Sequence, residues 1–411
     1  MTGTYRQFER RHITRTIALV GALALSTTGC AWLARSSVPT GPPPGWFERG
    51  DSDQPAISAS GRYVAFVSSD TTLGTGAGIF NVFVRDNLTN TTELMSATTA
   101  GAAAGGNSPR ISDDGRYVAF SSSSASIVPG DLDGMTDVFV RDRIAGTTTL
   151  ASVNDDESAI STAANALGLS GDGGSVAFCI VSGSIGPLAF CGQTAVRNVA
   201  SGTTRLLPYL HTATMAGEAV LSHDGSRVAY TELFFNGSAS TISAAVADIT
   251  SGTILADLRT SPFHFAGETD FALDLSPDGS TYAITESHTG VPGSVEIGRV
   301  EGTSPPTIRA YGWAAQARLR NDNTTIALLT RVSEITETRP VLVVDDGVNP
   351  LRIVGNNSRG DHPVYVTNFD FSHDGQWVAF ATRDGALDPT HGTFWSAIYT
   401  RSVAQRLDPP N

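Results

Sequence analysis

The chain has 411 residues and a formal net charge of −13, and all of its 27 basic residues are arginines. Nucleic acid is excluded as a partner, because so acidic a chain offers no basic stripe to neutralise phosphates. Charged residues make up only 16% of the chain while glycine is abundant, which favours short strands and tight turns over long amphipathic helices.

The first 30 residues have the pattern of an export signal. A basic stretch over residues 6–15 precedes the apolar run Ile17–Leu25, which is too short for a membrane span of about 20 residues. Thr27–Cys30 then resembles the lipobox of bacterial lipoproteins, although that family prefers Leu where Thr27 stands. The resemblance implies acylation of Cys30; ordinary cleavage after Ala31 is the alternative.

We therefore predict a signal peptide over residues 1–30 and an exported protein, held only by a lipid anchor. Its location would be the cell envelope, at the outer face of the cytoplasmic membrane, in the periplasm or at the cell surface. Residues 31–54 contain a cluster of prolines and are predicted to form an extended tether between this anchor and the fold.

One pattern recurs from residue 55 to residue 408. A short strand ends at a serine, a turn of the Asp-Gly type follows, and an apolar strand such as Tyr63–Val67 comes next. A third strand, a second glycine turn and a Thr-rich fourth strand such as Thr147–Leu150 complete the unit. The copies are spaced by roughly 52 residues, a length typical of propeller repeats. They open at Ile57-Ser58, Ile111-Ser112, Leu169-Ser170, Leu221-Ser222, Leu275-Ser276, Leu319-Arg320 and Phe371-Ser372.

Ser112–Gly115 and its counterparts resemble the WD40-like (PD40) repeat of TolB-type propellers, whose hallmark is a Ser-x-Asp-Gly turn before an apolar strand. The resemblance implies an all-β fold, a seven-bladed β-propeller of four-stranded antiparallel blades. It does not imply one function, because the repeat occurs in binding scaffolds, peptidase accessory domains and lyases. TolB itself has a further N-terminal α/β domain, so its role does not transfer. For ring closure, our hypothesis is that Trp46–Arg49 completes blade seven.

Three aspartates in blade two form a candidate metal site. Asp131, Asp133 and Asp137 stand around Gly134 in the predicted connection between the second and third strands. Carboxylates at such spacing can direct oxygens at one Ca²⁺ ion, although the later glutamate of an EF-hand loop is missing. Two interpretations stay open here: a calcium ligand set, and aspartates that hydrogen-bond within their own loop.

Two cysteines remain once Cys30 is set aside. Cys179 and Cys191 lie on adjacent strands of one predicted hairpin, within reach of each other, and an exported protein meets an oxidising compartment. We predict a disulfide between them; two buried free thiols are the alternative.

The predicted layout gives the ring two different faces. Turns within each blade are short on one face, and the connections between strands two and three and between blades are longer on the other. Long loops on a rigid scaffold are the usual place for binding. The candidate ligand face on the long-loop side contains His211, His264, His288, Trp313, His362, His391 and Trp395.

The sequence predicts a binding scaffold without enzymatic activity, a monomer that takes a protein or glycan through its long-loop face. No Gly-x-Ser-x-Gly elbow occurs, and without lysine no phosphate-binding Gly-Lys motif exists. Two alternatives stay open: a metal-assisted polysaccharide lyase or hydrolase, and a structural assembly protein of the envelope. Apart from the calcium candidate, no cofactor is expected.

Overall fold

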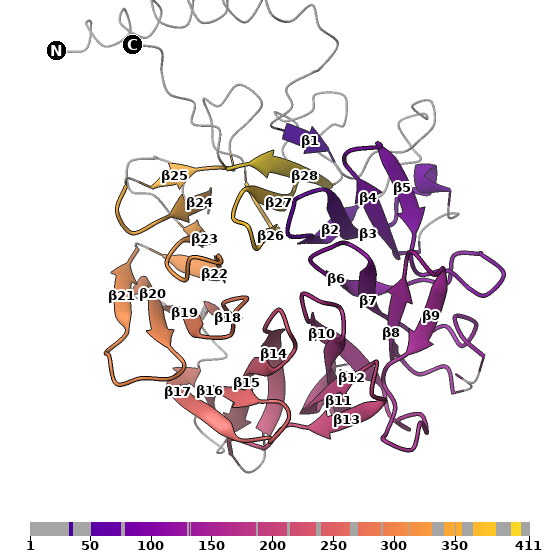
Figure 1. Ribbon diagram of the computed structural model, residues 1–411, viewed down its shortest axis with the longest axis horizontal. Helices are drawn as coiled ribbons and strands as arrows, with labels where there is room; N and C mark the ends of the chain where they lie inside the picture. Colours follow the sequence, from indigo (N-terminus) through magenta and orange to yellow (C-terminus); the bar gives the residue numbers. More distant parts are fainter. Residues whose placement is uncertain are drawn as a thin grey trace, which may run out of the picture.

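Seven four-stranded antiparallel sheets surround a central axis in the computed structural model (Figure 1). Its only helical segment, among the residues that the structure describes, is the short 3₁₀ turn η1 (Thr71–Leu73). No helix in that part of the chain is long and apolar enough to cross a membrane. The structure describes residues 33–35, 51–74, 79–129, 131, 133–185, 188–211, 214–235, 240–263, 270–288, 291–311, 313–330, 341–349, 351–355, 365–383 and 396–403.

Blades one to four follow the chain, each with its strands paired in sequence order. Their strands are β2 (Ser52–Ile57), β3 (Tyr63–Ser68), β4 (Asn81–Asp86) and β5 (Thr91–Leu94); β6 (Asn107–Ile111), β7 (Tyr117–Ser122), β8 (Asp137–Asp142) and β9 (Thr147–Leu150); β10 (Ala164–Leu169), β11 (Ser175–Ile185), β12 (Leu188–Asn198) and β13 (Thr203–Leu206); and β14 (Thr214–Leu221), β15 (Arg227–Phe235), β16 (Ser240–Asp248) and β17 (Ile254–Phe263).

Blades five to seven complete the ring, and the predicted seven-bladed all-β fold is confirmed. Blade six is the least regular, because its fourth strand has only two residues. The strands are β18 (Asp270–Leu275), β19 (Thr281–His288), β20 (Val291–Arg299) and β21 (Thr307–Ala310); β22 (Ala314–Leu319), β23 (Ile326–Thr330), β24 (Val341–Asp345) and β25 (Arg352–Ile353); and β26 (Asn368–Phe371), β27 (Trp377–Thr382) and β28 (Ala397–Ser402), with β1 (Leu33–Arg35).

Local hydrogen bonds explain the repeated Ser-x-Asp-Gly turn. In blade two the Ser112 hydroxyl donates to Asp114 Oδ1 (2.6 Å) and accepts the main-chain N–H of Tyr117 (2.9 Å). Asp114 Oδ1 also accepts the N–H of Arg116 (2.8 Å). Each turn therefore satisfies its own main-chain donors, as short polar side chains at turns do. The same Ser–Asp bond recurs in blades three, four, five and seven.

The turn glycine also receives an aromatic ring from the preceding blade. Gly61 has a φ of 71°, in the left-handed region that favours glycine. A Cβ atom there would come within 2.2 Å of the Trp377 ring, so blade seven packs directly on the turn of blade one. The Tyr63 and Tyr117 rings lie in the same way on the glycines of the next blades, Gly115 and Gly173.

The hydrophobic core lies between neighbouring blades. The second strand of blade two, β7, is buried on both faces, as its unbroken apolar sequence predicts. Phe120 and Phe139 stack with centroids 5.7 Å apart and join a cluster with Val84 of blade one. Because each blade shares such a cluster with its neighbour, the ring is one continuous core.

The N-terminal strand β1 closes the ring, beside β28 (Figure 1). It pairs antiparallel with β28, with Leu33 opposite Arg401 and Arg35 opposite Tyr399. The hypothesis that Trp46–Arg49 supplies this strand is thus wrong, because Leu33–Arg35 forms it; Trp46–Arg49 lies outside the described part of the chain. Any extended segment that lies beside β28 can pair with it, and the sequence pattern does not show which segment does so.

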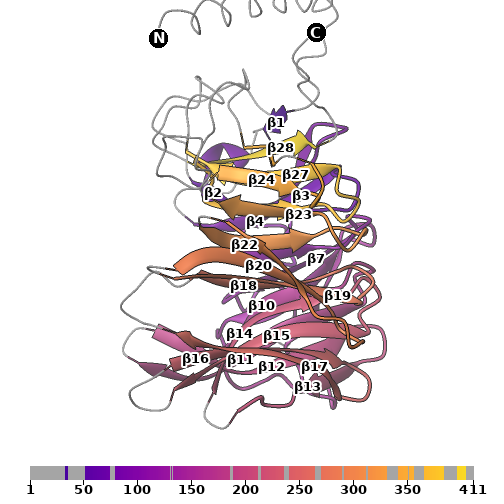
Figure 2. The same ribbon diagram turned by 90° about the vertical axis from the view of Figure 1, so that its left-hand side faces the viewer.

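The prediction of long loops between second and third strands is wrong for blades three, four and five. There the two strands lengthen into hairpins instead, so that only residues 186–187, 236–239 and 289–290 separate them. Backbone groups that leave the core of the blade stay paired with each other in a hairpin, which satisfies their hydrogen bonds without a loop. Figure 2 shows the ring edge-on, with these longer strands running across it.

Candidate functional site

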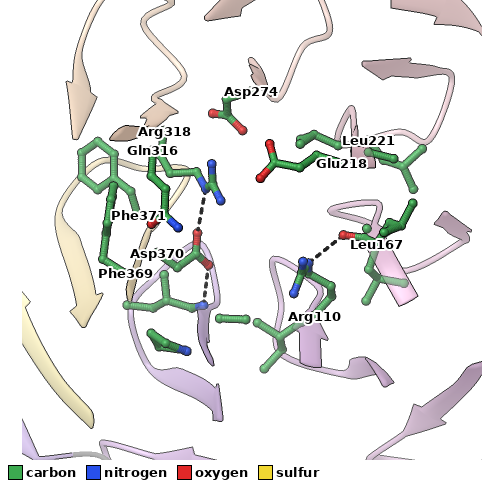
Figure 3. Close-up of a pocket in the computed structure, with 18 of the residues that line it drawn as sticks. Arg110, Leu167, Glu218, Leu221, Asp274, Gln316, Arg318, Phe369, Asp370 and Phe371 are labelled. Carbon is green, nitrogen blue, oxygen red and sulfur yellow. Dashed lines mark hydrogen bonds and ion pairs between the residues drawn. The ribbon is translucent and has the colours of Figure 1, made fainter. Parts of the chain in front are cut away.

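A channel of about 370 Å³ runs along the axis and is lined by the first strands of all seven blades. First strands face the axis because they are the innermost strand of each sheet (Figure 1). Figure 3 shows charged side chains from several blades directed into this channel. It is the best-defined concave site among the residues that the structure describes, and small-molecule sites are usually of this kind.

Four charged side chains lie at the same height in the channel wall. Each is the next-to-last residue of its first strand, at a position that the other first strands fill with Ala, Gly or Val. The spacing is visible in the sequence as a charge at fixed distance before the turn, but we did not single it out there. The four residues are Arg110, Asp274, Arg318 and Asp370.

Three carboxylates in the channel join pairs of neighbouring blades. Each accepts a main-chain N–H from the first strand of the following blade, which fixes the carboxylate. Such bonds from main chain to carboxylate are charge-assisted, and they link blade four to five, five to six and seven to one. The N–H to oxygen pairs are Leu273 with Glu218 (3.1 Å), Leu319 with Asp274 (2.5 Å) and Ile57 with Asp370 (2.8 Å).

Arg318 is the counter-charge of these carboxylates. Burial disfavours its charged form, but the charges of Asp274, Glu218 and Asp370 hold the pKa of Arg318 above its ordinary value. Its Nε lies 3.9 Å from Asp370 Oδ1. Asp274 is only 6% exposed, and this burial raises its pKa to about 6 despite the nearby guanidinium. Arg318 therefore compensates part of the negative charge of these three carboxylates.

Arg110 has a different environment on the blade-two side of the channel. Its Nε and Nη1 donate to the carbonyl oxygens of Leu167 and Pro109, both at 2.8 Å. Burial and the charge of Arg318 lower the pKa of Arg110, and the charges of Asp370 and Glu218 offset this only in part. None of the described carboxylates forms an ion pair with Arg110, which lines the channel (Figure 3).

Three side chains from separate blades meet at the short-turn end of the channel. Asp113 Oδ2 lies 2.5 Å from His223 Nδ1, and Asp113 Oδ1 lies 2.6 Å from His373 Nδ1. Burial would raise the pKa of Asp113, but the two histidines hold it below its ordinary value. In turn Asp113 raises the pKa of His373 against the effect of burial. Blades two, four and seven are thereby bridged across the axis, which narrows this end.

The predicted ligand face is only partly within the described residues. His211 Nε2 is 2.7 Å from Ser243 Oγ and its ring is 5.4 Å from that of Phe234, so it is docked on blade four. Trp313 packs against the core between blades six and seven. These two residues do not come together. Outside the described part of the chain lie His264, His362, His391, Trp395 and the side chain of His288.

The sequence analysis gave no role to His223 and His373, which lie in the turns after the first strands of blades four and seven. The structure brings these two histidines together on Asp113, whereas the described members of the predicted ligand face stay apart. All three residues directly follow a repeat serine, and that shared offset was the available signal. It was missed because contact between blades two, four and seven depends on the size and tilt of the whole ring.

The predicted cysteine pair and the predicted aspartate cluster both consist of residues that are close in sequence, and the structure places each set together. A disulfide joins Cys179 in β11 to Cys191 in β12, with their Cα atoms 5.4 Å apart. The ligand atoms of Asp131, Asp133 and Asp137 lie within 4.8 Å of one another. The signal region, including Cys30, lies outside the described residues.

No protein-family model and no curated protein matches the chain. Solved structures that are similar to it do exist. An oligogalacturonate lyase from Vibrio parahaemolyticus is similar at a TM-score of 0.56, with 12% identity over 91% of this chain and 94% of its own. An oligogalacturonate lyase in complex with manganese has a TM-score of 0.53 and 13% identity over 86% of this chain and 89% of its own. The likeness is one of fold.

TolB-type propellers are among the similar structures, as the repeat predicted. TolB from Acinetobacter baumannii is 20% identical, with a TM-score of 0.38 over 63% of this chain. The matched region spans about half of TolB's own length, 56%.

Proposed function

We propose that this protein is a binding scaffold that takes an acidic ligand, a glycan or a protein segment, through the long-loop face and into the channel. The observation that carries this proposal is that Arg110 lines the channel without an ion-pair partner among the described carboxylates. An arginine whose Nη2 has no described partner, facing a channel lined by all seven blades, is suited to a carboxylate or sulfate group.

Further polar groups in the channel fit a hydroxyl-rich ligand. Gln316 lines the channel, and its Oε1 is buried with no hydrogen-bond partner in the structure. A buried amide without a partner is costly, and a ligand hydroxyl would satisfy it. Because Asp113 and the two histidines narrow the short-turn end, entry from the long-loop face is favoured. An acidic oligosaccharide would supply both a carboxylate for Arg110 and a hydroxyl for Gln316.

Binding of an acidic oligosaccharide tests the proposal. We expect oligogalacturonate to bind the purified protein more tightly than a neutral oligosaccharide of the same length, measured by isothermal titration calorimetry. Arg110→Gln should weaken oligogalacturonate binding by about tenfold or more, since a charge-assisted pair contributes roughly 1.5–3 kcal/mol. Arg205→Gln is the matched control, because Arg205 is exposed on the outer strand β13. Equal affinity for the acidic and neutral sugars would contradict the proposal.

A metal-assisted polysaccharide lyase or hydrolase is the alternative function. It is favoured by the fold shared with oligogalacturonate lyases, one of them in complex with manganese. The same titration discriminates the two, because a lyase would convert oligogalacturonate to products with ultraviolet-absorbing unsaturated ends. Turnover of this kind, dependent on added metal, would replace the scaffold proposal. A structural role in envelope assembly would leave both sugars unbound.

We also propose that Cys30 anchors this scaffold to the envelope. The strand β1 that closes blade seven begins at Leu33, so an acyl chain on Cys30 would hold the ring within about 10 Å of the membrane, at up to 3.6 Å per residue. Mass spectrometry of the N-terminal peptide should find a lipid-modified Cys30. A free N-terminus at Trp32 would show cleavage after Ala31 instead.

A further inference from the structure

The connection between β7 and β8 in blade two brings three carboxylates together on the long-loop side. The ligand oxygens of Asp131, Asp133 and Asp137 all lie within 4.8 Å of one another. Asp131 and Asp137 are each only 2% exposed, while Asp133 is exposed. Like charges at this distance repel strongly in a buried setting, so the cluster needs a compensating cation or proton.

Asp131 is the decisive member of this cluster. Both of its carboxylate oxygens are buried, and neither accepts a hydrogen bond of good geometry from the described residues, although the main-chain N–H of Asp133 lies nearby. Among the described residues, no arginine or histidine forms an ion pair with any of the three aspartates. A buried carboxylate without a well-placed donor is among the costliest groups in a protein interior. One of its oxygens lies within 4.8 Å of an oxygen of each of the other two carboxylates, so a single cation could contact all three.

Blade one provides an internal comparison. Asn81 begins the third strand there, opposite Ser68, as Asp137 does opposite Ser122 in blade two. The Asn81 amide is fully paired: its Oδ1 accepts from Ser96 Oγ (3.1 Å), and its Nδ2 donates to a carbonyl oxygen (3.0 Å).

In blade two Asp137 Oδ1 likewise accepts from the equivalent hydroxyl, Ser152 Oγ (2.5 Å). Its second oxygen stands where asparagine would present a donor. The same backbone frame is therefore complete with an amide in blade one, whereas the carboxylate of blade two requires a positive partner.

We propose that Asp131, Asp133 and Asp137 bind a calcium ion in the connection between β7 and β8. The donors are all carboxylate oxygens, without histidine or cysteine, which selects a hard cation over a transition metal. Calcium accepts irregular oxygen sets, whereas Mg²⁺ demands near-ideal octahedral geometry. The ion would tie the exposed Asp133 to the first residue of β8 and so order this rim of the long-loop face.

This site is separate from the channel and does not rest on the proposed ligand. Ile127 and Val128 anchor the start of the same connection in the core between blades one and two. A calcium ion at the other end would hold the connection at both ends. Loss of the ion should therefore loosen the rim while the blades remain folded.

Calcium binding by the purified mature protein tests the site. After treatment with EDTA, calorimetric titration with CaCl₂ should show one ion per chain with a Kd on the order of 10⁻⁴ M, the range of extracellular modules. MgCl₂ should bind at least tenfold more weakly. Excess CaCl₂ should raise the thermal unfolding midpoint by about 3 °C, because the ion binds only the folded state.

Asp137→Asn copies the residue of blade one and should therefore fold. We expect it to lower calcium affinity at least tenfold and to remove the calcium-dependent rise in midpoint, with a calcium-free midpoint equal to or above that of the wild type. Asp156→Asn is the control, because Asp156 is an exposed residue of the connection between β9 and β10, and its described hydrogen bonds come from Ser158. The proposal fails if the wild type shows no calcium heat, or if Asp137→Asn retains the full calcium effect.

Discussion

Replacing Arg318 with methionine should lower the free energy of unfolding by about 3 kcal/mol at pH 8, the scale found when one member of a buried charge cluster is removed. Methionine keeps much of the volume, so the loss is mainly electrostatic. Asp274 is left as a buried carboxylate whose one hydrogen-bond donor is the N–H of Leu319. Chemical denaturation followed by circular dichroism measures the effect.

Arg110→Met is the matched control for this experiment. Both arginines line the channel from first strands, but Arg110 forms no ion pair with the described carboxylates and gives up only its bonds to two carbonyl oxygens. Its replacement should cost about 1 kcal/mol, the value of ordinary hydrogen bonds. Equal losses for the two variants would show that Arg318 does not compensate the channel carboxylates.

The cost of Arg318→Met should also depend on pH. The pKa of Asp274 is raised to about 6 in the folded protein, above 3.8 for an ordinary aspartate, and loss of the guanidinium raises it further. A carboxyl group whose pKa is higher in the folded state than in the unfolded state destabilises the fold as the pH rises through the folded-state pKa. The difference between wild type and variant should therefore be largest at pH 8 and shrink toward pH 5. A difference that grows on acidification would contradict this account.

Removal of the disulfide between Cys179 and Cys191 should cost about 3 kcal/mol, the chain-entropy value for a bond that closes a loop of this length. The pair spans 12 positions in the hairpin of β11 and β12, whose register shifts at Val181. Cys179→Ala combined with Cys191→Ser avoids new thiol chemistry, and urea denaturation measures the loss.

Two comparisons distinguish a local from a global effect of the disulfide. Reduced wild type should match the double variant, and dithiothreitol should leave the variant unchanged. Hydrogen exchange should rise mainly in the outer part of the β11–β12 hairpin, because a local opening there need not unfold neighbouring blades. Unchanged stability on reduction would show that the hairpin holds its register by strand pairing alone.

The channel combines structural and ligand-binding groups in one ring. Three carboxylates join neighbouring blades through main-chain N–H groups, and Arg318 compensates part of their charge. Arg110 has no ion-pair partner among the described carboxylates, and the Oε1 of Gln316 accepts no hydrogen bond from a described residue. Rigid surroundings of this kind favour binding, because little further ordering is required when a ligand arrives.

Local features of the fold were predictable because their causes lie within one repeat. Ser112 and Asp114 complete their turn with neighbours at most five residues away. The apolar sequence of Tyr117–Ser122 predicts a strand that is buried on both faces. The disulfide partners were the two cysteines of one hairpin. The signal peptide and the lipid anchor stay predictions, as does the monomeric state.

Features that join distant repeats could not be predicted. Asp113 meets His223 from 110 residues away, and which side chains face one another across a ring depends on its blade number and tilt. The closing strand Leu33–Arg35 was assigned to the tether, because a three-residue strand has no periodicity to reveal it.

The sequence is enough to predict the seven repeats, their turn chemistry, the cysteine pair and the three aspartates of one loop, since each depends on residues within one blade. The folded ring was needed to show that Arg110, Asp274, Arg318 and Asp370 share one channel and that β1 completes blade seven. Hydrogen bonds inside a blade are made between residues close in sequence, whereas the axis is built from one strand of every blade.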